Sequence, residues 1–336
     1  MAGELVLITG ATGHLGYRVL VDALKTGYRV RAAVRNHAKA AKILSAPSLK
    51  SINPGSNLQF VDVPDMLAPG AYDEAIKGAT YVIHIASPLP AELKEGDDPE
   101  KVLINPAVQG TLNILEAAKK AGTVKRVVIT SSIVAIMPLE QIASPDPDIV
   151  IDETSRTELA APPYANNLAA YCASKVKAFN DTEEWVKREK PGFDVINIHP
   201  SFIIGANELA TTPEEAFMGT NSLALGLLVG KDIGSVPGGS NHLLDTALAH
   251  VKALDSKVPG NTSYIVSAAA HQWESAWEIF EREFPEAAKS GNFTKGNVVT
   301  TPMRFDTKKS EEILGMKYMG YEEQVKHVVS HYLTLL

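Results

Sequence analysis

The chain has 336 residues, of which 45% are hydrophobic and 21% are charged, a composition typical of a protein with a large buried core. Its formal net charge is −7 and it has no dense run of lysine and arginine, which argues against nucleic acid or an anionic membrane as a partner. The single cysteine excludes an internal disulfide and a cysteine-rich zinc site, and we expect no metal.

Short apolar segments alternate with helical patterns over the first 200 residues. The predicted strands are 5–9, 29–34, 58–63, 80–86, 125–132 and 193–200. The helical patterns between them cover 15–27, 38–44, 71–78, 100–121 and 169–189. The apolar runs lack strict alternation with polar residues, so both faces of each strand are expected to be covered. The order predicts an α/β fold with a doubly wound parallel sheet.

After residue 200 the pattern becomes mainly helical. Predicted helices cover 214–229, 241–254, 272–284 and 321–335, with one short strand near 263–266 and turns rich in glycine, proline and asparagine between them. We therefore predict a dinucleotide-binding domain over 1–200 and a smaller C-terminal substrate lobe over 201–336, with some segments of the lobe returning to the first domain. A long loop, 138–163, precedes the helix of 169–189, and loops of this length are usually functional or mobile.

The segment LVLITGATGHLG joins the first predicted strand to the first predicted helix. Three glycines at spacings of three allow a tight turn, close approach of the backbone to a pyrophosphate, and close packing of helix and strand. The N–H groups at the start of the helix favour an anion. The sequence thus predicts a Rossmann-type dinucleotide site whose turn consists of Gly10, Thr12, Gly13, His14, Leu15 and Gly16.

The end of the second predicted strand indicates which dinucleotide is bound. Arg35 stands at that strand end and Lys39 follows four residues later, whereas no acidic residue lies between Arg29 and Leu49. An acidic residue at this place binds the ribose 2′-hydroxyl of NAD, and an arginine accommodates a 2′-phosphate. The pattern therefore favours NADPH/NADP+, although two cations near a helix start can also be merely solvated.

The segment AAYCASKVKAF poses a choice between a thiol and a tyrosine as the reactive group. Tyr171 and Lys175 are four residues apart and share a helix face, whereas Cys172 points about 100° away and has no histidine partner nearby. A lysine beside a tyrosine favours the phenolate and so tunes the tyrosine for proton transfer. Ser131 and Ser132, at the end of the fifth predicted strand, supply a hydroxyl to hold a substrate oxygen.

These features resemble the extended short-chain dehydrogenase/reductase family, whose motifs match TGATGHLG, TSS and YCASK. Further segments, among them VRAAVRNHAK, PAVQGTLNILEAA and NIHPSFIIG, are similar to its dihydroflavonol reductase-like and fungal carbonyl reductase branch. The resemblance implies that Ser132, Tyr171 and Lys175 are catalytic. It also implies a set of residues that line the cofactor besides the turn and Lys175: Asp65, Met66, Ala86, Ser87, Pro200 and Ile203.

The implied activity is NADPH-dependent reduction of an aldehyde, ketone or keto ester to an alcohol, with Tyr171 as proton donor and Lys175 lowering its pKa. Leu89, Ile133, Val134 and Phe202 are candidate walls of the substrate pocket, although any of them could equally be core. Two positions depart from relatives. Ala107 stands where many have an asparagine, a replacement that the reductase branch often shows. Arg156 stands where a tryptophan is common, so the substrate mouth is expected to differ.

Other interpretations remain open at this point. The same scaffold serves nucleotide-sugar epimerases and dehydratases, which Arg35 disfavours, and non-catalytic NADP sensors, which often lose the tyrosine–lysine pair. His327 and His331 have the i, i+4 spacing of a zinc pair, but a surface helix explains them better. The start of the chain lacks signal-peptide features and no apolar run is long enough to cross a bilayer, so we expect a cytoplasmic monomer or homodimer.

Overall fold

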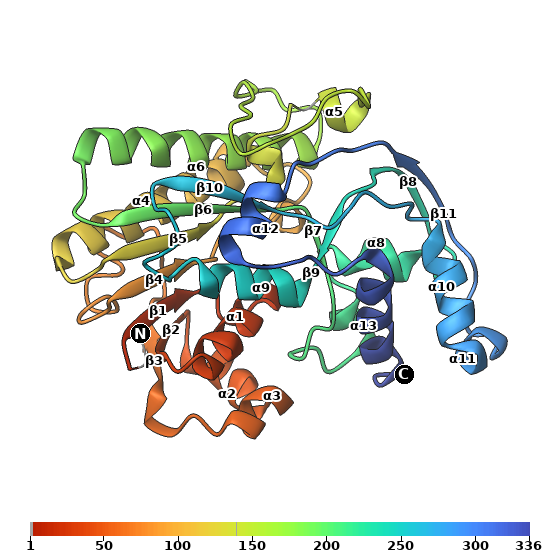
Figure 1. Cartoon of the computed structure of the whole chain (residues 1–336), viewed down its shortest axis with the longest axis horizontal. Coiled ribbons are helices and arrows are strands. Elements are labelled where there is room, and N and C mark those ends of the chain that lie inside the picture. The colour runs from red at the N-terminus through yellow and green to blue at the C-terminus, as the bar shows by residue number, and fades with distance from the viewer. Residues whose placement is uncertain (1–2, 139) are drawn as a thin grey trace. The chain divides into compact units, whose positions relative to one another are not determined.

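A computed structural model describes residues 3–138 and 140–336, and the chain folds into two compact units. The first unit consists of residues 1–139, 154–199 and 247–264, and the second of residues 140–153, 200–246 and 265–336. The chain thus leaves the first unit twice and returns to it twice, at residues 154 and 247, before the C-terminal segment, and Figure 1 lets the path be followed by colour.

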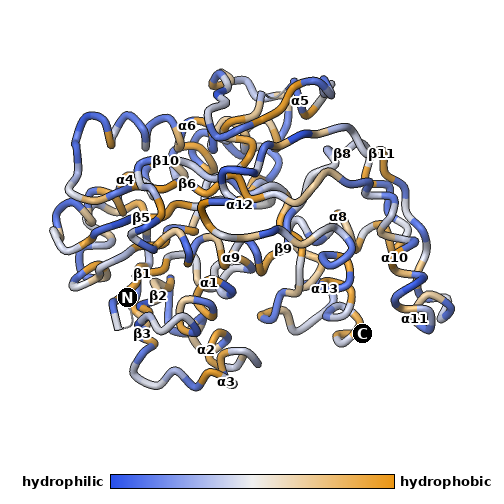
Figure 2. Tube along the Cα trace, viewed as in Figure 1, coloured by the Kyte–Doolittle hydropathy of each residue, from blue (hydrophilic) through white to orange (hydrophobic). Residues whose placement is uncertain are grey.

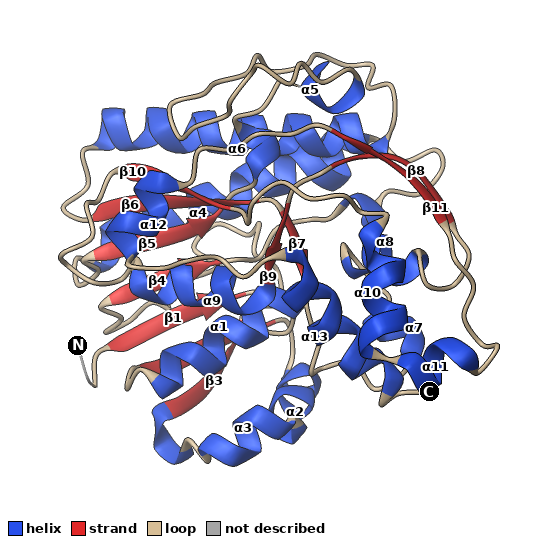
Figure 3. Cartoon of the chain, turned by 45° about the vertical axis from the view of Figure 1, so that its right-hand side comes forward, coloured by secondary structure: helices blue, strands red, loops and turns tan. Residues whose placement is uncertain are grey.

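The first unit is built on a seven-stranded sheet with the order β10-β6-β5-β4-β1-β2-β3. Its strands are β1 (Leu5–Thr9), β2 (Arg29–Val34), β3 (Leu58–Asp62), β4 (Tyr81–His84), β5 (Arg126–Thr130), β6 (Asp194–Pro200) and β10 (Thr262–Val266). All pairings from β3 to β6 are parallel, as Figure 3 shows. The strand order reverses between β1 and β4, so the predicted doubly wound sheet is confirmed, and ligands bind at such a reversal in this fold class.

Helices accompany the strands of this sheet. They are α1 (His14–Lys25), α2 (His37–Ser45), α3 (Pro47–Ile52), α4 (Asn105–Ala121), α6 (Asn167–Glu189) and α9 (Leu243–Lys252). The helix α4 is preceded directly by a short π-helical turn, Glu100–Ile104. Gly122, at a φ of +67°, ends α4, which allows the chain to turn into β5.

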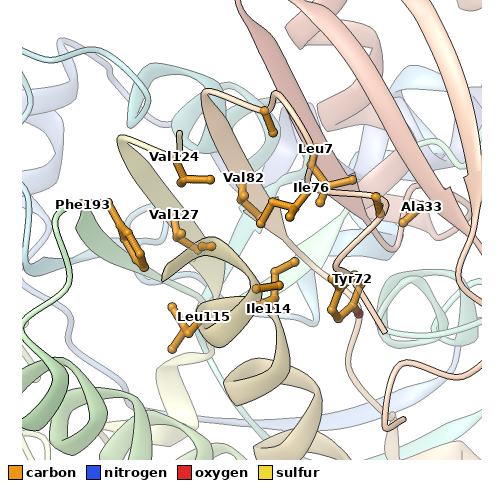
Figure 4. Packing of buried hydrophobic residues seen from close by; sticks show 14 of the residues in the cluster. Leu7, Ala33, Tyr72, Ile76, Val82, Ile114, Leu115, Val124, Val127 and Phe193 are labelled. Carbon is orange, nitrogen blue, oxygen red and sulfur yellow. The ribbon is translucent and has the colours of Figure 1, made fainter. Parts of the chain in front are cut away.

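Every residue of β1 is buried, because successive side chains point to opposite faces and helices cover both faces. Leu5 and Leu7 join one core cluster, which α4 supplies with Ile114 and Leu115. Figure 4 shows side chains of β1, β4, β5 and α4 meeting in this cluster. Figure 2 shows that hydrophobic residues dominate the central strands of the unit. The sheet and α4 therefore pack against each other through one shared hydrophobic core.

The second unit contains short helices and two small parallel sheets. Its helices are α5 (Glu140–Ala143), α7 (Pro213–Ala216), α8 (Asn221–Gly226), α10 (Ser275–Glu283), α11 (Pro285–Lys289), α12 (Lys308–Leu314) and α13 (Tyr321–Leu333). Its sheets pair β7 (Phe202–Ile204) with β9 (Ser240–His242) and β8 (Asp232–Pro237) with β11 (Asn297–Thr301). Trp273 and Phe280 are fully buried and form the centre of its core.

Three predicted elements differ in the structure. The segment 71–78 forms consecutive turns instead of a helix, and left-handed glycines bound it, Gly70 before it and Gly78 at its end, each at a φ of +70°. The predicted helix 214–229 is two short helices, α7 and α8, separated at Gly219 with a φ of +66°. The strand near 263–266 was expected in the smaller lobe, but it is β10, at the edge of the main sheet.

Candidate active site

The turn between β1 and α1 has a backbone that only glycine permits at two positions. Gly10 has a φ of +74°, and a Cβ there would lie 2.8 Å from the backbone nitrogen of Ala86. A Cβ at Gly16 would lie 2.0 Å from the carbonyl oxygen of Gly10. Both contacts are closer than atoms can approach, so the bare backbone brings β1, α1 and the end of β4 together.

The first turn of α1 is open toward the end of the sheet. Gly13 is the N-cap and gives the helix no side-chain hydrogen bond, and Thr12 and Gly13 are exposed. His14 is half-buried, whereas Leu15 is buried and can offer a ligand only its backbone N–H. Uncapped N–H groups at a helix start suit a phosphate, so this turn fits the pyrophosphate of a dinucleotide.

Arg35 and Lys39 are exposed at the end of β2 and the start of α2. The side chain of Asn36 caps α2 by accepting a hydrogen bond from the backbone N–H of Lys39 at 3.3 Å. His37 contacts Asp62 at 2.7 Å, so this neighbouring carboxylate is already engaged. Within the part of the chain that the structure describes, no salt bridge joins either cation to a carboxylate, and both can therefore receive a phosphate.

Asp65 and Met66 follow β3 and lie beside α4. A carboxylate oxygen of Asp65 accepts the backbone N–H of Leu67 at 2.9 Å, which fixes the turn. The methyl end of Met66 lies so close to Gly110 that a Cβ there would be 2.1 Å from it. Asn113 donates to the carbonyl oxygen of Met66 at 2.9 Å. The loop is thereby held on α4.

The three predicted catalytic residues come together in the first unit. Ser132 lies close enough to Tyr171 to lower the pKa of its phenol. The Lys175 nitrogen lies 5.6 Å from the centre of the Tyr171 ring and donates to the hydroxyl of Ser87 at 3.1 Å. Ser131, the other serine at the end of β5, is buried and lines an internal cavity instead. The structure therefore separates the two serines and places Ser132 against the tyrosine.

The local sequence explains how α6 presents this pair. Asn166 caps the helix by accepting the N–H of Ala169 at 2.9 Å. Ala170 and Ala173 are almost completely buried, and small residues let the helix approach its neighbours closely. Cys172 is buried too, and burial raises the pKa of its thiol to about 12. The thiol is therefore protonated and inert, which leaves the tyrosine as the reactive group of this segment.

Burial shifts the pKa values of both members of the pair. Burial raises the pKa of Tyr171 to about 12, and the nearby Cys172 acts in the same direction, while Ser132 lowers it. Burial lowers the pKa of Lys175 to about 8. Burial thus outweighs Ser132 in setting the pKa of Tyr171, and the lowering of this pKa by Lys175 stays a prediction. Tyr171 is consequently held as a neutral phenol at physiological pH.

The candidate substrate residues have different surroundings. Leu89 is exposed, Val134 is half-buried and Ile133 is only 6% exposed. Phe202 belongs to the second unit, where it packs edge-on against Trp273 with ring centres 5.9 Å apart. Buried Ile133 has the environment of a core residue, so Leu89 and Val134 are the candidates with surface to offer.

The remaining cofactor candidates lie around the ends of β4 and β6. Ala86 lies two residues after the end of β4, and its N–H donates to the hydroxyl of Thr9 at 3.2 Å. Ser87 accepts the hydrogen bond from Lys175. Pro200 is the last residue of β6, and Ile203 lies in the second unit, paired with Asn241 between β7 and β9.

Arg156, expected near the substrate mouth, is engaged with α6. Its guanidinium pairs with Glu183 at 2.8 Å and lies over the ring of Phe179 at 4.9 Å. Both partners follow Lys175 on α6, at one turn and at just over two turns along the helix. The arginine therefore fastens the loop 154–166 to this helix.

Sequence reasoning missed two buried polar residues at the ends of β1 and β4, one of which, His84, interacts with Lys175. His84 ends β4 and is 2% exposed, and Thr9 ends β1 and is 1% exposed. The two side chains are hydrogen-bonded at 2.8 Å. The sequence does contain a sign of this pair. A histidine inside the apolar run TYVIHIA is expected to be buried, and a buried polar group needs a hydrogen-bond partner.

The chain is similar to proteins that are already known. A family model described as the NAD dependent epimerase/dehydratase family matches residues 6–266. The chain belongs to this family. Ketoreductase CTB6 of Cercospora nicotianae is 40% identical to it, over 100% of this chain and 96% of the relative.

Solved structures agree with this membership. Gre2 of Candida albicans in complex with NADPH is 26% identical and has a TM-score of 0.84, with 99% of each chain covered. Yeast methylglyoxal/isovaleraldehyde reductase Gre2, also complexed with NADPH, is 25% identical with the same TM-score and 98% of each chain covered. The recognition of the chain from its motifs and its Rossmann-type fold are confirmed.

Within residues 3–138 and 140–336, histidine, cysteine and carboxylate side chains form no group of three or more that could coordinate a metal ion. In the same part of the chain, no helix combines the length and hydropathy needed to cross a bilayer.

Proposed function

We propose that this protein is an NADPH-dependent carbonyl reductase that converts an aldehyde, ketone or keto ester into an alcohol, with Tyr171 as the proton donor. The observation that carries the proposal is that Ser132 and Lys175 both lie beside Tyr171, the lysine on the same helix face with its nitrogen 5.6 Å from the ring centre. Kinship over nearly the whole chain with a named ketoreductase and with reductase structures assigns the enzyme to the oxidoreductases that act on carbonyl or CH–OH groups.

The residues around the strand ends fit a dinucleotide with a 2′-phosphate. The turn of Gly10 and Gly16 leaves no room for side chains, which suits a pyrophosphate against the start of α1. Arg35 and Lys39 would hold the 2′-phosphate, since both are exposed. Binding of NADPH by the two Gre2 structures supports this choice of cofactor. When bound, NADPH supplies the hydride for the reduction.

The protein's own side chains supply the proton and the electrostatic stabilisation. Ser132 donates a hydrogen bond to the substrate carbonyl oxygen, and Tyr171 gives its proton to that oxygen as negative charge develops on it. The raised pKa of Tyr171 keeps the phenol protonated before reaction. Lys175, close to the ring, stabilises the phenolate that remains after proton transfer.

The substrate class rests on the surroundings of the pair and on relatives. Exposed Leu89 and half-buried Val134 are apolar residues of the first unit that can contact the body of a substrate. Ketoreductase CTB6 carries a ketone-reducing activity in its name, and yeast Gre2 is named for two aldehydes. A nucleotide-sugar epimerase on this scaffold is a weaker candidate, since exposed Arg35 replaces the acidic ribose reader that NAD favours.

The test is NADPH oxidation by the purified protein, beside NADH, against aryl ketones, keto esters and aldehydes. We expect turnover with NADPH, and Tyr171→Phe should lower kcat by about 10³, because a positioned proton donor contributes 10²- to 10⁴-fold. NADPH affinity, measured by fluorescence titration, should stay within a factor of about three, because Tyr171 is not one of the residues proposed to bind the phosphates. Undiminished turnover in Tyr171→Phe would remove the tyrosine from the mechanism.

A second variant tests the cofactor choice. Arg35→Ser should weaken NADPH binding by about 10- to 100-fold and leave NADH binding unchanged, because a charge-assisted bond to phosphate is worth about 1.5–3 kcal/mol. Arg188→Ser is the matched control, since Arg188 is exposed at the far end of α6. Equal losses for both cofactors would contradict a 2′-phosphate contact.

A further inference from the structure

A small polar cavity lies inside the first unit, beside the buried end of Lys175. Its volume is about 20 Å³, and its lining includes His84, Ser87, Ala107, Thr111, Lys175 and Asn197. One water molecule needs a cavity of roughly 10–15 Å³ and two to four polar partners. The short side chain of Ala107 leaves this space unfilled on the side of α4.

The hydrogen bonds around Thr9 fix the proton of His84. The Thr9 hydroxyl oxygen accepts the backbone N–H groups of Ile85 at 3.1 Å and Ala86 at 3.2 Å. A hydroxyl has two lone pairs and one hydrogen, so the hydrogen of Thr9 points to Nδ1 of His84, 2.8 Å away. Nδ1 therefore accepts, and this assignment from the network places the imidazole proton on Nε2.

This Nε2–H group has no hydrogen-bond partner among the residues that the structure describes. The histidine is 2% exposed, so bulk water does not serve the donor either. Burial, with the charge of Lys175, lowers the pKa of His84 to about 3, so the ring stays neutral. A buried donor without a partner is costly, and His84 is among the residues that line the cavity.

The ammonium of Lys175 also reaches the cavity. It carries three N–H groups, and the hydrogen bond that the described part of the chain provides for it goes to Ser87. Thr111 donates its own hydrogen to the carbonyl oxygen of Ala107 at 2.9 Å, which leaves its lone pairs to accept. The cavity thus offers a water two donors and an acceptor.

We propose that one water molecule occupies this cavity and accepts hydrogen bonds from Nε2–H of His84 and from Lys175, so that His84 is a positioning residue for the lysine. The water donates one hydrogen to Thr111. It solvates an ammonium that is otherwise buried, and so holds the charge of Lys175 in place beneath Tyr171. The role of the charge rests on the proposed reductase function, whereas the water itself does not.

The bridge stabilises the protonated form of the lysine. Two titratable side chains face Lys175: His84 from β4 and Tyr171 from its own helix. The groups that α4, β5 and β6 present to the cavity, among them Thr111 and Asn197, are uncharged. Loss of the water therefore removes solvation from the ammonium without introducing a new charge, and the lysine releases its proton at lower pH.

The experiment compares His84→Phe, which keeps the ring volume, with His84→Gln, which restores an N–H donor near the place of Nε2. For each variant, kcat/KM for NADPH-dependent reduction is measured from pH 6 to pH 10. We expect the alkaline limb of the profile to move to lower pH by about one unit in His84→Phe and to return toward wild type in His84→Gln. The KM for NADPH should change much less than kcat at pH 8.

His250→Phe is the matched control. His250 is another buried histidine of the first unit, and it contacts the strand-end residue Thr130 at 2.8 Å. Its replacement should lower the Tm without moving the alkaline limb. A merely structural role for His84 predicts the same behaviour in His84→Phe, and an unmoved limb in that variant would overturn the proposal.

A crystal structure of the wild-type protein keeps the proposal testable if His84→Phe fails to fold. We expect one water within hydrogen-bond distance of both the Lys175 nitrogen and Nε2 of His84, and an empty cavity would overturn the proposal. Wild-type protein that reduces no carbonyl compound would instead contradict the proposed function, while the presence of the water would still be decided by the crystal structure.

Discussion

Two helices of this protein carry a pair of reactive side chains at the same spacing. Tyr171 and Lys175 are four residues apart on α6, and His327 and His331 are four residues apart on α13. In both cases the helical period places the pair on one face. From the sequence alone, either pair could form part of a functional site.

The surroundings of the two pairs are entirely different. Tyr171 faces Ser132, a hydroxyl at the end of a sheet strand, within the first unit. His327 stacks on His242 with ring centres 4.7 Å apart, and its Nδ1 accepts the backbone N–H of Ala206 at 3.3 Å. The spacing places two side chains together, but the element opposite them determines whether they meet a substrate or the core of their own unit.

Among the variants that test this comparison, we expect the largest loss of activity from Lys175→Met. The variant keeps the length and apolar stem of the side chain but removes its charge, so the Tyr171 phenolate loses its stabilisation. We expect kcat/KM for NADPH-dependent reduction to fall by about 10³. The Tm should not fall, since burying this charge carries a desolvation cost. Activity within tenfold of wild type would show that α6 needs only its tyrosine.

Ser132→Ala removes the hydroxyl that lies beside Tyr171 and distinguishes the surroundings of this pair from those of the histidine pair on α13. We expect a loss of about 10² in kcat with NADPH binding unchanged, because one hydrogen-bond donor to a developing oxyanion is worth about 2.7–4 kcal/mol. Ser131→Ala, at the neighbouring buried serine, is the matched control and should lose far less. If Ser131→Ala were the more damaging of the two, the assignment of the catalytic serine would be reversed.

The pH dependence gives a smaller effect. The folded pKa of Lys175 is about 8, so its protonated fraction, and with it the reduction rate, should fall about tenfold between pH 7 and pH 9. Folding stability should instead rise with pH. The unfolded chain keeps the lysine proton up to the ordinary lysine pKa, so the contribution of Lys175 to stability increases between pH 8 and that value. Rate profiles beside thermal unfolding at each pH check both signs, and Lys175→Met should abolish the contribution of this group.

The smallest effect is expected on α13. His331→Gln should leave kcat/KM within a factor of about two, since the histidine lies in the second unit and the proposed chemistry uses none of its atoms. Added Zn²⁺ should leave the Tm of wild type and variant alike, as measured by differential scanning fluorimetry. A metal-dependent rise in Tm that His331→Gln abolishes would revive the zinc interpretation of this pair.

The main sheet was predictable because its strands have a strong local signal. The runs at β1, β4 and β5 are mainly apolar, and burial on both faces produces such runs. The small parallel pairs β7–β9 and β8–β11 gave no such signal. The strands β7 and β9 have three residues each, and β8 is largely exposed, so pairing with a distant segment determines these strands more than their own residues do.

The site was predictable where it depends on backbone geometry or helical spacing. Gly10 and Gly16 are required by close approach, and Tyr171 and Lys175 by the helix period. The bond between Thr9 and His84 joins residues 75 positions apart, and only the register of β1 beside β4 brings them together. The pKa of Tyr171 depends on how much solvent the folded chain excludes, which no local pattern reveals.

The return of residues 247–264 to the first unit has a consequence for the order in which the protein is made. On the ribosome, the edge strand β10 becomes available only after 266 of the 336 residues have been synthesised. Buried Arg126 also gains partners late, because it donates hydrogen bonds to the carbonyl oxygens of Ala253 and Asp255 at 2.9 Å and 2.5 Å. An unpaired strand edge is prone to pair with other chains, so protection of this edge depends on a segment that is made late.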